Sequence, residues 1–190
     1  MDFKAHIRLP RELVCSLKNQ QLLPSRVILS VSVDSQTMRL FERASVPRNS
    51  GAFPQYELRK RYIVSTSAYG IGQVAGSNQT PLGLHRVAKK IGGGYPIGTV
   101  FRSRKEVGLT WQGLPDGSIV HRILWLEGLE PGYNCGGNVD TFNRYIYIHG
   151  FGDETTLGRP YSHGCIHLSA QDLIPLYDRL PTGTMVWIAP

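Results

Sequence analysis

Hydrophobic and polar residues alternate in several short segments of the chain, and this two-residue period is typical of β-strands. In residues 27–33, three valines and Leu29 fall on one face, whereas Ile28 and two serines fall on the other. The polar residues 34–36 predict a turn into a second strand at 37–42. A loop is predicted over residues 45–54. Further strands are predicted at 61–67, 84–90, 119–126, 144–149 and 182–188.

Only two segments show the hydrophobic spacing of a helix. Residues 11–21 follow Pro10, and residues 169–180 begin at Ser169, a residue type that caps helices well. Pro175 lacks a backbone donor and is expected to bend the second helix slightly. The sequence therefore predicts a mainly β fold, a β-sandwich or mixed β-sheet with a few short helices.

The composition indicates an ordinary globular protein with a basic surface. Its 190 residues are most simply one domain, long enough to bury a hydrophobic core. The formal net charge is +7, from 21 lysines and arginines against 14 acidic residues. Because the basic residues are scattered, with short clusters only at 59–61 and 102–105, no nucleic-acid partner is predicted. The positive electrostatic field of such a surface would still steer an acidic substrate toward the protein.

The cysteine count and the first residues bear on the compartment. Cys15, Cys135 and Cys165 are too few and too irregularly spaced for a disulfide framework, and they fit a reducing environment. The first 26 residues lack an apolar stretch of signal-peptide length, and no segment is long enough to span a membrane. A cytoplasmic protein is therefore predicted, with a periplasmic location as the alternative if a leader has been removed.

Residues 161–168, Tyr-Ser-His-Gly-Cys-Ile-His-Leu, carry the clearest chemical signal. Cys165 lies two positions from both His163 and His167, and histidine is the usual base for a cysteine nucleophile. Gly164 permits a tight backbone, so that its amide and that of Cys165 could point into one oxyanion hole. This pattern favours a thiol enzyme.

A further histidine lies upstream, where an apolar strand ends in His149 and Gly150, 16 residues before Cys165. The intervening residues 151–161 predict a loop that returns the chain to Cys165 and covers the site as a lid. By contrast, the glycine-rich residues 70–76 lack the third glycine and the following helix of a nucleotide-binding motif. No cofactor is predicted.

Two other interpretations of the cysteine motif stay open at this point. On a strand, His163, Cys165 and His167 would face one way, and with His149 they could hold zinc through one sulfur and three nitrogens. The intervening glycine and the absence of paired cysteines argue against a metal site, and none is predicted. The second alternative is an inert, buried cysteine beside core histidines.

The motifs together resemble the L,D-transpeptidase (YkuD-type) catalytic domain. The resemblance rests on the strand ending in His-Gly, the Ser-His-Gly-Cys-Ile motif, the Ser-Ala-x-Asp helix and the closing Gly-Thr-x-Val strand. Residues 65–67 (Ser-Thr-Ser) and 80–83 (Thr-Pro-Leu-Gly) resemble two weaker elements of that family. The match covers roughly residues 27–188. It implies a β-rich catalytic domain, expected at 25–190, behind an N-terminal arm with a short helix at 1–24.

The resemblance also implies a thiol enzyme that acts on peptidoglycan stem peptides. Carried over by position, Cys165 is the nucleophile, His149 is its base, and the backbone carbonyl of Gly150 orients the imidazole. His163 lies in the wall of the site, and the amides near Gly164 and Cys165 form the oxyanion hole. The thiolate would attack the L,D bond between the diamino acid at position three and a terminal D-alanine, leaving a thioester on the enzyme.

One position departs from the family pattern, which commonly has arginine or asparagine where this chain has His167. A histidine there can donate a hydrogen bond only as the imidazolium or in the right neutral tautomer. Packing is therefore as good an expectation for His167 as contact with substrate. The other candidate substrate-binding residues are Ser162, Tyr161, Arg159 and Arg144. The two arginines would meet substrate carboxylates, although a solvated surface position is the simpler expectation for each.

The acceptor of the thioester decides the product. Water would make the protein an L,D-carboxypeptidase, whereas the amine of a second stem peptide would make it a transpeptidase that forms 3–3 cross-links. The lack of an export signal and the short lid favour water, with tetrapeptides, soluble muropeptides or nucleotide-linked precursors as substrates. Carbapenem-type β-lactams are expected to acylate Cys165. An inactive peptidoglycan-binding module is the alternative from a different class.

Overall fold

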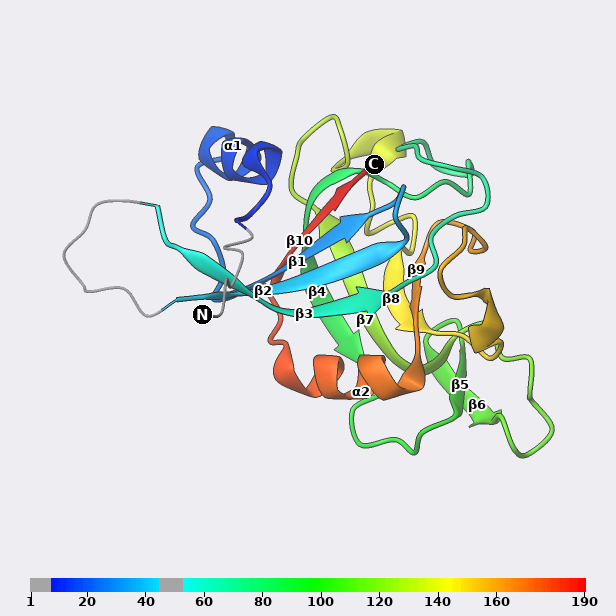
Figure 1. Cartoon of the computed structure of the whole chain (residues 1–190). Coiled ribbons are helices and arrows are strands. Elements are labelled where there is room, and N and C mark those ends of the chain that lie inside the picture. The colour runs from blue at the N-terminus through cyan, green and yellow to red at the C-terminus, as the bar shows by residue number, and fades with distance from the viewer. Residues whose placement is uncertain (1–7, 45–52) are drawn as a thin grey trace.

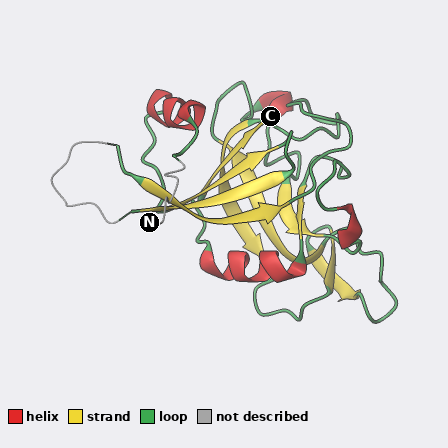
Figure 2. Ribbon diagram, viewed as in Figure 1, coloured by secondary structure: helices red, strands yellow, loops and turns green. Residues whose placement is uncertain are grey.

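Figure 1 shows a computed structural model of the chain, which describes residues 8–44 and 53–190. The first seven residues of the predicted N-terminal arm lie outside the described residues, and so does the predicted loop 45–54 except for its last two residues. Strands dominate the described part, and its two α-helices are short (Figure 2). The prediction of a mainly β fold with a few short helices is confirmed.

Among the described residues, ten strands form one hydrogen-bonded sheet. Its main path runs β3-β2-β1-β10-β4-β7-β5-β6, and β8 pairs with both β7 and β9 beside this path. The pairs β1–β10 and β8–β9 are parallel and the others are antiparallel, so the sheet is mixed. The strands are β1 (Val27–Ser32), β2 (Thr37–Arg43), β3 (Tyr56–Ile63), β4 (Gly83–Ile91), β5 (Thr99–Arg102), β6 (Lys105–Leu109), β7 (Val120–Gly128), β8 (Tyr147–Gly150), β9 (Ile166–Leu168) and β10 (Met185–Ala189).

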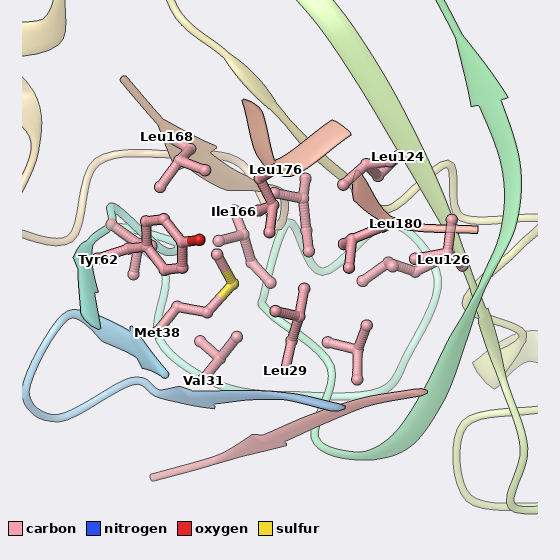
Figure 3. Close-up of a cluster of buried hydrophobic side chains, with 14 of the residues drawn as sticks. Leu29, Val31, Met38, Tyr62, Leu124, Leu126, Ile166, Leu168, Leu176 and Leu180 are labelled. Atoms are coloured by element: carbon pink, nitrogen blue, oxygen red, sulfur yellow. The ribbon is translucent and has the colours of Figure 1, made fainter. Parts of the chain in front are cut away.

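The main hydrophobic core lies between the sheet and the helix α2 (Ala170–Arg179) (Figures 1 and 3). Leu29 of β1, Leu124 of β7 and Leu176 of α2 point into it together with Ile166 of β9. Burying one such side chain contributes about 1.5–3 kcal/mol to folding. Because Ile166 directly follows Cys165, this burial fixes the backbone beside the candidate nucleophile.

The helix α2 begins immediately after β9, as its sequence predicts. The Ser169 hydroxyl accepts a hydrogen bond from the backbone N–H of Asp172 at 3.2 Å, which satisfies one of the donors left free at a helix start. Leu173 and Leu176 form part of its buried face. The cap and this face together set where β9 ends and, with it, where the Cys165 segment lies.

A second hydrophobic cluster corrects the prediction for β1. Ile28 was expected to face outward with the serines, but it is completely buried beneath the helix α1 (Arg11–Asn19). Leu13 and Leu17 of α1 pack in the same cluster. A strand covered by the core on one face and by a helix on the other is buried on both faces, so the outward assignment of Ile28 was wrong.

Candidate active site

His149 lies near the end of β8, between β7 and β9. Its side chain is 2% exposed, and its Nδ1 lies 2.8 Å from the backbone carbonyl oxygen of Gly150. In the neutral tautomer that donates this bond, Nε2 carries the free lone pair. Burial lowers the pKa of His149 to about 4, against the opposing effect of the bond to Gly150. At pH 7 the imidazole is therefore neutral and able to accept a proton.

Cys165 directly precedes β9, which runs parallel to β8. Its Sγ accepts a hydrogen bond from the backbone N–H of Tyr147 at 3.4 Å and donates one to the carbonyl oxygen of Tyr145 at 3.5 Å. Burial raises the pKa of Cys165 to about 11, whereas the Tyr147 amide and the charge of Arg144 lower it. Because the thiol is neutral at pH 7, a base must remove its proton before it can act as a nucleophile.

One pocket of about 620 Å³ joins these groups, with His149, Cys165 and His167 all among its lining residues. Its volume falls within the usual range for sites that bind small molecules. The remaining lining residues are Ala68, Tyr69, Ser118, Ile119, Phe151, Tyr161 and His163. A ligand in this pocket would touch the thiol, the imidazole and several aromatic rings at once.

The backbone around Cys165 is shaped by Ser162 and Gly164. The Ser162 hydroxyl donates to the carbonyl oxygen of Cys165 at 2.5 Å and accepts the N–H of Gly164 at 3.2 Å. Gly164 has a φ of +116°, and an added Cβ would lie 3.1 Å from Ile146 Cδ1 and 3.2 Å from the carbonyl oxygen of Gln79. Only glycine fits this position without strain. Ser162 was expected to bind substrate, but its side chain instead holds the motif together. In this structure the Ser162 hydroxyl also accepts the Gly164 amide that was assigned to the oxyanion hole.

The two weaker upstream elements lie directly beside the cysteine motif. Ser65 forms an antiparallel bridge with His167, in which each backbone N–H bonds to the carbonyl of the other at 3.2 and 2.8 Å. Ser67 forms a parallel bridge with Ser162, and its N–H donates to the Thr80 hydroxyl at 3.0 Å. These contacts place both upstream elements beside the cysteine motif.

Arg144 has partners that its sequence position did not reveal. Its guanidinium donates to the carbonyl oxygens of Gly72 at 3.1 Å, Gln73 at 2.8 Å and Gln79 at 2.7 Å. Arg144 was expected to meet a substrate carboxylate or solvent, and it instead holds the glycine-rich segment 70–79 beside the site. Its pKa is lowered by burial and raised by the nearby Cys165, which also places its charge close to the thiol.

Arg159 lies in the loop that joins β8 to the cysteine motif. Its side chain is exposed, and it is not among the residues that line the pocket. The loop itself is tied to the domain: Gly152 N–H bonds to the carbonyl of Gly117 at 3.0 Å, and Gly158 N–H bonds to that of Val64 at 2.9 Å. Phe151 at its start lines the pocket, so the segment predicted as a lid forms part of the wall.

Aromatic side chains form the rest of this wall. Tyr161 contacts Phe151 edge-on, with ring centres 5.6 Å apart, and the exposed His163 lies 5.3 Å from the Tyr69 ring. Tyr161 and His163 were predicted to line the site. Phe151 and Tyr69 were not predicted, although the position of Phe151 directly after Gly150 is a signal that the sequence offered.

His167 is 4% exposed and stacks on Phe151, with ring centres 4.5 Å apart and planes 7° from parallel. Its ring centre lies 4.8 Å from that of His149, and its buried Nδ1 has no hydrogen-bond partner among the described residues. Burial and the neighbouring His149 and His163 lower the pKa of His167 to about 2. The imidazolium form considered from the sequence is thus disfavoured, and His167 lies here as a neutral, packed ring.

Within residues 8–44 and 53–190, no three histidine, cysteine or acidic side chains are placed together so that they could hold a metal ion. His163 is exposed whereas His167 is buried, although both line the pocket. The described helices also include none long and apolar enough to cross a membrane.

Residues 26–188 match the model of the YkuD family, the L,D-transpeptidase catalytic domain. The chain belongs to this family. The resemblance drawn from its motifs is therefore confirmed for nearly the whole domain. No curated protein matches this YkuD domain.

Solved structures resemble the YkuD domain at low sequence identity. A structure of Bd1075 from Bdellovibrio bacteriovorus is 16% identical with a TM-score of 0.56, over 96% of this chain and 54% of that one. LD transpeptidase LdtMt1 in complex with imipenem is 17% identical with a TM-score of 0.49, over 86% and 59%. L,D-transpeptidase 3 from Mycobacterium tuberculosis, with a faropenem-derived adduct, is 17% identical with a TM-score of 0.48, over 87% and 60%. This chain thus spans less than two thirds of the length of these proteins.

Proposed function

We propose that the protein cleaves the L,D bond of peptidoglycan tetrapeptide stems through a thioester on Cys165, with water as the favoured acceptor. The observation that carries this proposal is that Cys165 and His149 line one pocket while the Gly150 carbonyl holds the His149 ring. A nucleophile, a base and a group that orients the base are the parts that acyl transfer by a thiol requires.

The charge states define the first step. Because the pKa of Cys165 is raised to about 11 and that of His149 is lowered to about 4, both groups start neutral. His149 Nε2 takes the thiol proton as Sγ bonds to the carbonyl carbon of the third residue. The bond from this carbon to the alanine nitrogen then breaks, and the nitrogen leaves with the proton from His149. For this step the thiol must exchange its bond to the Tyr145 carbonyl for one to His149.

Hydrolysis reverses these proton movements. Water loses a proton to His149 Nε2 and bonds to the thioester carbon, the C–S bond breaks, and Cys165 recovers its proton. Support for water as acceptor comes from the pocket, because a second stem peptide would have to share about 620 Å³ with the acyl group. Water needs no such room. A transpeptidase that uses a stem-peptide amine is the alternative for this second step.

The first test is mass spectrometry of the purified protein with a disaccharide tetrapeptide as the sole substrate. Loss of one alanine without a dimer supports the carboxypeptidase, and a cross-linked dimer supports the transpeptidase instead. Cys165→Ala should abolish either product. Cys15→Ala is the matched control, because it removes an exposed thiol far from the pocket and should leave the product unchanged.

A second measurement separates a working thiol from a binding module. Imipenem should acylate the unsubstituted protein and Cys15→Ala but not Cys165→Ala, as shown by intact mass. A thiol that is neither acylated nor active on the tetrapeptide would point to the inactive peptidoglycan-binding module. Muropeptides and nucleotide-linked tetrapeptides in parallel assays would define the substrate. The cytoplasmic location stays a prediction, which fractionation of cells carrying the tagged full-length gene would test.

A further inference from the structure

Outside the pocket, two cations and three aromatic rings gather beside the active site. Arg104 holds its guanidinium carbon 4.7 Å from the ring centre of Tyr145 and 5.1 Å from that of Trp125. Lys89 places its Nζ 5.6 Å from the ring centre of Trp125 and 5.4 Å from that of Phe142. We call these five residues the cationic-aromatic cluster. None of them lines the pocket that contains His149.

Tyr145 connects this cluster to the nucleophile. The residue is 50% exposed and its ring lies beneath Arg104, while its carbonyl oxygen accepts the hydrogen bond from the Cys165 thiol at 3.5 Å. The next contact of Sγ, the backbone N–H of Tyr147, belongs to the same segment. Tyr145 therefore contacts the thiol through its backbone and Arg104 through its ring.

The two cations keep donors for a ligand, although Arg104 also hydrogen-bonds to the Tyr147 side chain. Within the described part of the chain, neither Arg104 nor Lys89 forms an ion pair with a carboxylate. The acidic Glu127 on the neighbouring β7 is already paired with Arg86 at 2.7 Å. Arg144, by contrast, uses its guanidinium to bind backbone carbonyls. Arg104 belongs to the short basic cluster at 102–105.

The turn that carries Arg104 is of an unusual kind. Ser103 and Arg104 join β5 to β6 with φ values of +47° and +66°. Two-residue hairpin turns of this shape favour asparagine and glycine, because other side chains are strained there. Here the turn instead carries a long side chain whose planar guanidinium lies over two rings, and such stacking fixes the orientation of its donors.

We propose that the cationic-aromatic cluster is a binding subsite for a carboxylate of the stem peptide, with Arg104 as the residue that binds it. This inference rests on the proposed function for its substrate. A guanidinium matches a carboxylate through two parallel hydrogen bonds and can keep its aromatic contacts while doing so. The stem peptide offers two sources of this group, the terminal alanine and any side-chain carboxylate.

The test measures binding on Cys165→Ala protein, which cannot turn the peptide over. Three peptides are titrated by calorimetry: the free tetrapeptide, its C-terminal amide, and a form with its side-chain carboxylates amidated. Arg104→Gln should weaken binding of the free tetrapeptide about tenfold, the effect of losing one charge-assisted contact. Arg104→Gln should not weaken binding of the peptide that already lacks the carboxylate bound by Arg104. This difference identifies which of the two carboxylates the subsite binds. Arg104→Lys, which keeps the charge, should recover part of the loss.

Arg102→Gln is the matched control, because it removes the same charge from an exposed position on the same hairpin. Its binding constants should stay within about twofold of those of the parent. Equal weakening of all three peptides by Arg104→Gln, or no weakening, would overturn the subsite, as would failure of every peptide to bind. Carboxylate-dependent binding without alanine release in the unsubstituted protein would instead reject the proposed function and leave the subsite standing.

A kinetic measurement guards against a structural effect of the substitution. In the active protein, Arg104→Gln should raise KM for the tetrapeptide about tenfold and change kcat by less than about threefold. Alkylation of Cys165 by the neutral reagent iodoacetamide should be unchanged, because it involves no carboxylate. A loss confined to kcat, or a changed alkylation rate, would show that the residue acts on the thiol and not on substrate binding.

Discussion

His85 in β4 and His149 in β8 have nearly the same surroundings on one side of the ring. Both are buried, and the Nδ1 of each lies near a backbone carbonyl, that of Gly83 at 3.0 Å and that of Gly150 at 2.8 Å. Burial lowers the pKa of both to about 4. They differ at the other nitrogen, because His85 Nε2 lies 3.2 Å from the Thr141 hydroxyl whereas His149 faces the pocket that contains Cys165.

The region around His85 is closed by further bonds. The Asn134 side chain donates to the carbonyls of Leu82 and Leu84 at 3.0 and 3.1 Å, and Glu130 accepts the N–H of Leu84 at 2.6 Å. A satisfied buried network of this kind makes the structure rigid. The comparison teaches that burial and a carbonyl partner alone do not make a base. The second nitrogen must also reach a proton donor in a space open to a ligand.

The largest expected effect comes from breaking this comparison at His149. His149→Asn should lower kcat/KM for alanine release about 1000-fold, because in the proposed mechanism the thiol loses the group that accepts its proton. His85→Asn should keep the activity within about tenfold and lower the melting temperature instead. Product formation by mass spectrometry and thermal unfolding check both variants. Comparable activity losses in the two would show that His149 has no special chemical role.

The second prediction concerns the thiol of Cys165, which lines the same pocket as His149. Because its pKa is raised to about 11, the thiolate fraction of Cys165 should increase about tenfold per pH unit between pH 7 and 9. The rate of alkylation by iodoacetamide, followed on the Cys165 peptide by mass spectrometry, should rise in proportion. A cysteine in an unstructured peptide, with a pKa of about 8.5, should begin to level off within this pH range. A plateau for Cys165 below pH 8 would mean that the resting state is a thiolate–imidazolium pair.

The third prediction uses the shared property of the two histidines. Their folded-state pKa values lie below that of an unfolded histidine, so below about pH 6.5 the unfolded chain binds protons that the folded chain does not. The free energy of unfolding should therefore decrease as the pH is lowered. At pH 5 each histidine should reduce it by about 2 kcal/mol relative to neutral pH. Urea unfolding at several pH values measures this slope. In His85→Asn it should be smaller by about 1.4 kcal/mol per pH unit, and an unchanged slope would contradict the lowered pKa.

The chemical parts of the site could be predicted from the sequence because they lie in short motifs. For His149, Cys165 and Gly164, the adjacent residues in the sequence predict the local backbone geometry. The partners of Arg144 could not be predicted, since Gly72 and Gln79 contribute backbone carbonyls, which every residue carries. Stacking of Phe151 on His167 likewise depends on how a loop folds back.

In the fold, too, features set by the local sequence could be predicted and features set by tertiary contacts could not. Strands with strong alternation were predicted, and so was α2, whose cap and apolar face are local. The strands β5, β6 and β9 were missed, because each has only three to five residues, too few to show a clear period-two pattern. Burial of Ile28 also escaped prediction, because the period-two pattern cannot show that α1 covers the outer face.

The smallest expected effect sharpens the comparison by making His85 resemble His149. Thr141→Val keeps the shape of a completely buried side chain and removes the hydroxyl from His85 Nε2. A buried nitrogen left without a partner should lower the free energy of unfolding by about 1–2 kcal/mol, with alanine release unchanged. Urea unfolding measures the loss, and Thr182→Val, at an exposed position, is the control.

A double-mutant cycle decides whether the hydroxyl acts through His85. If it does, adding Thr141→Val to His85→Asn should cost less than adding it to the unsubstituted protein, because the nitrogen that needs the hydroxyl is already gone. Additive losses would mean that Thr141 stabilises the domain by packing alone. In that case His85 would take no part in the reaction because the space around it is closed. The difference from His149 would then lie in access to the pocket and not in the second hydrogen bond.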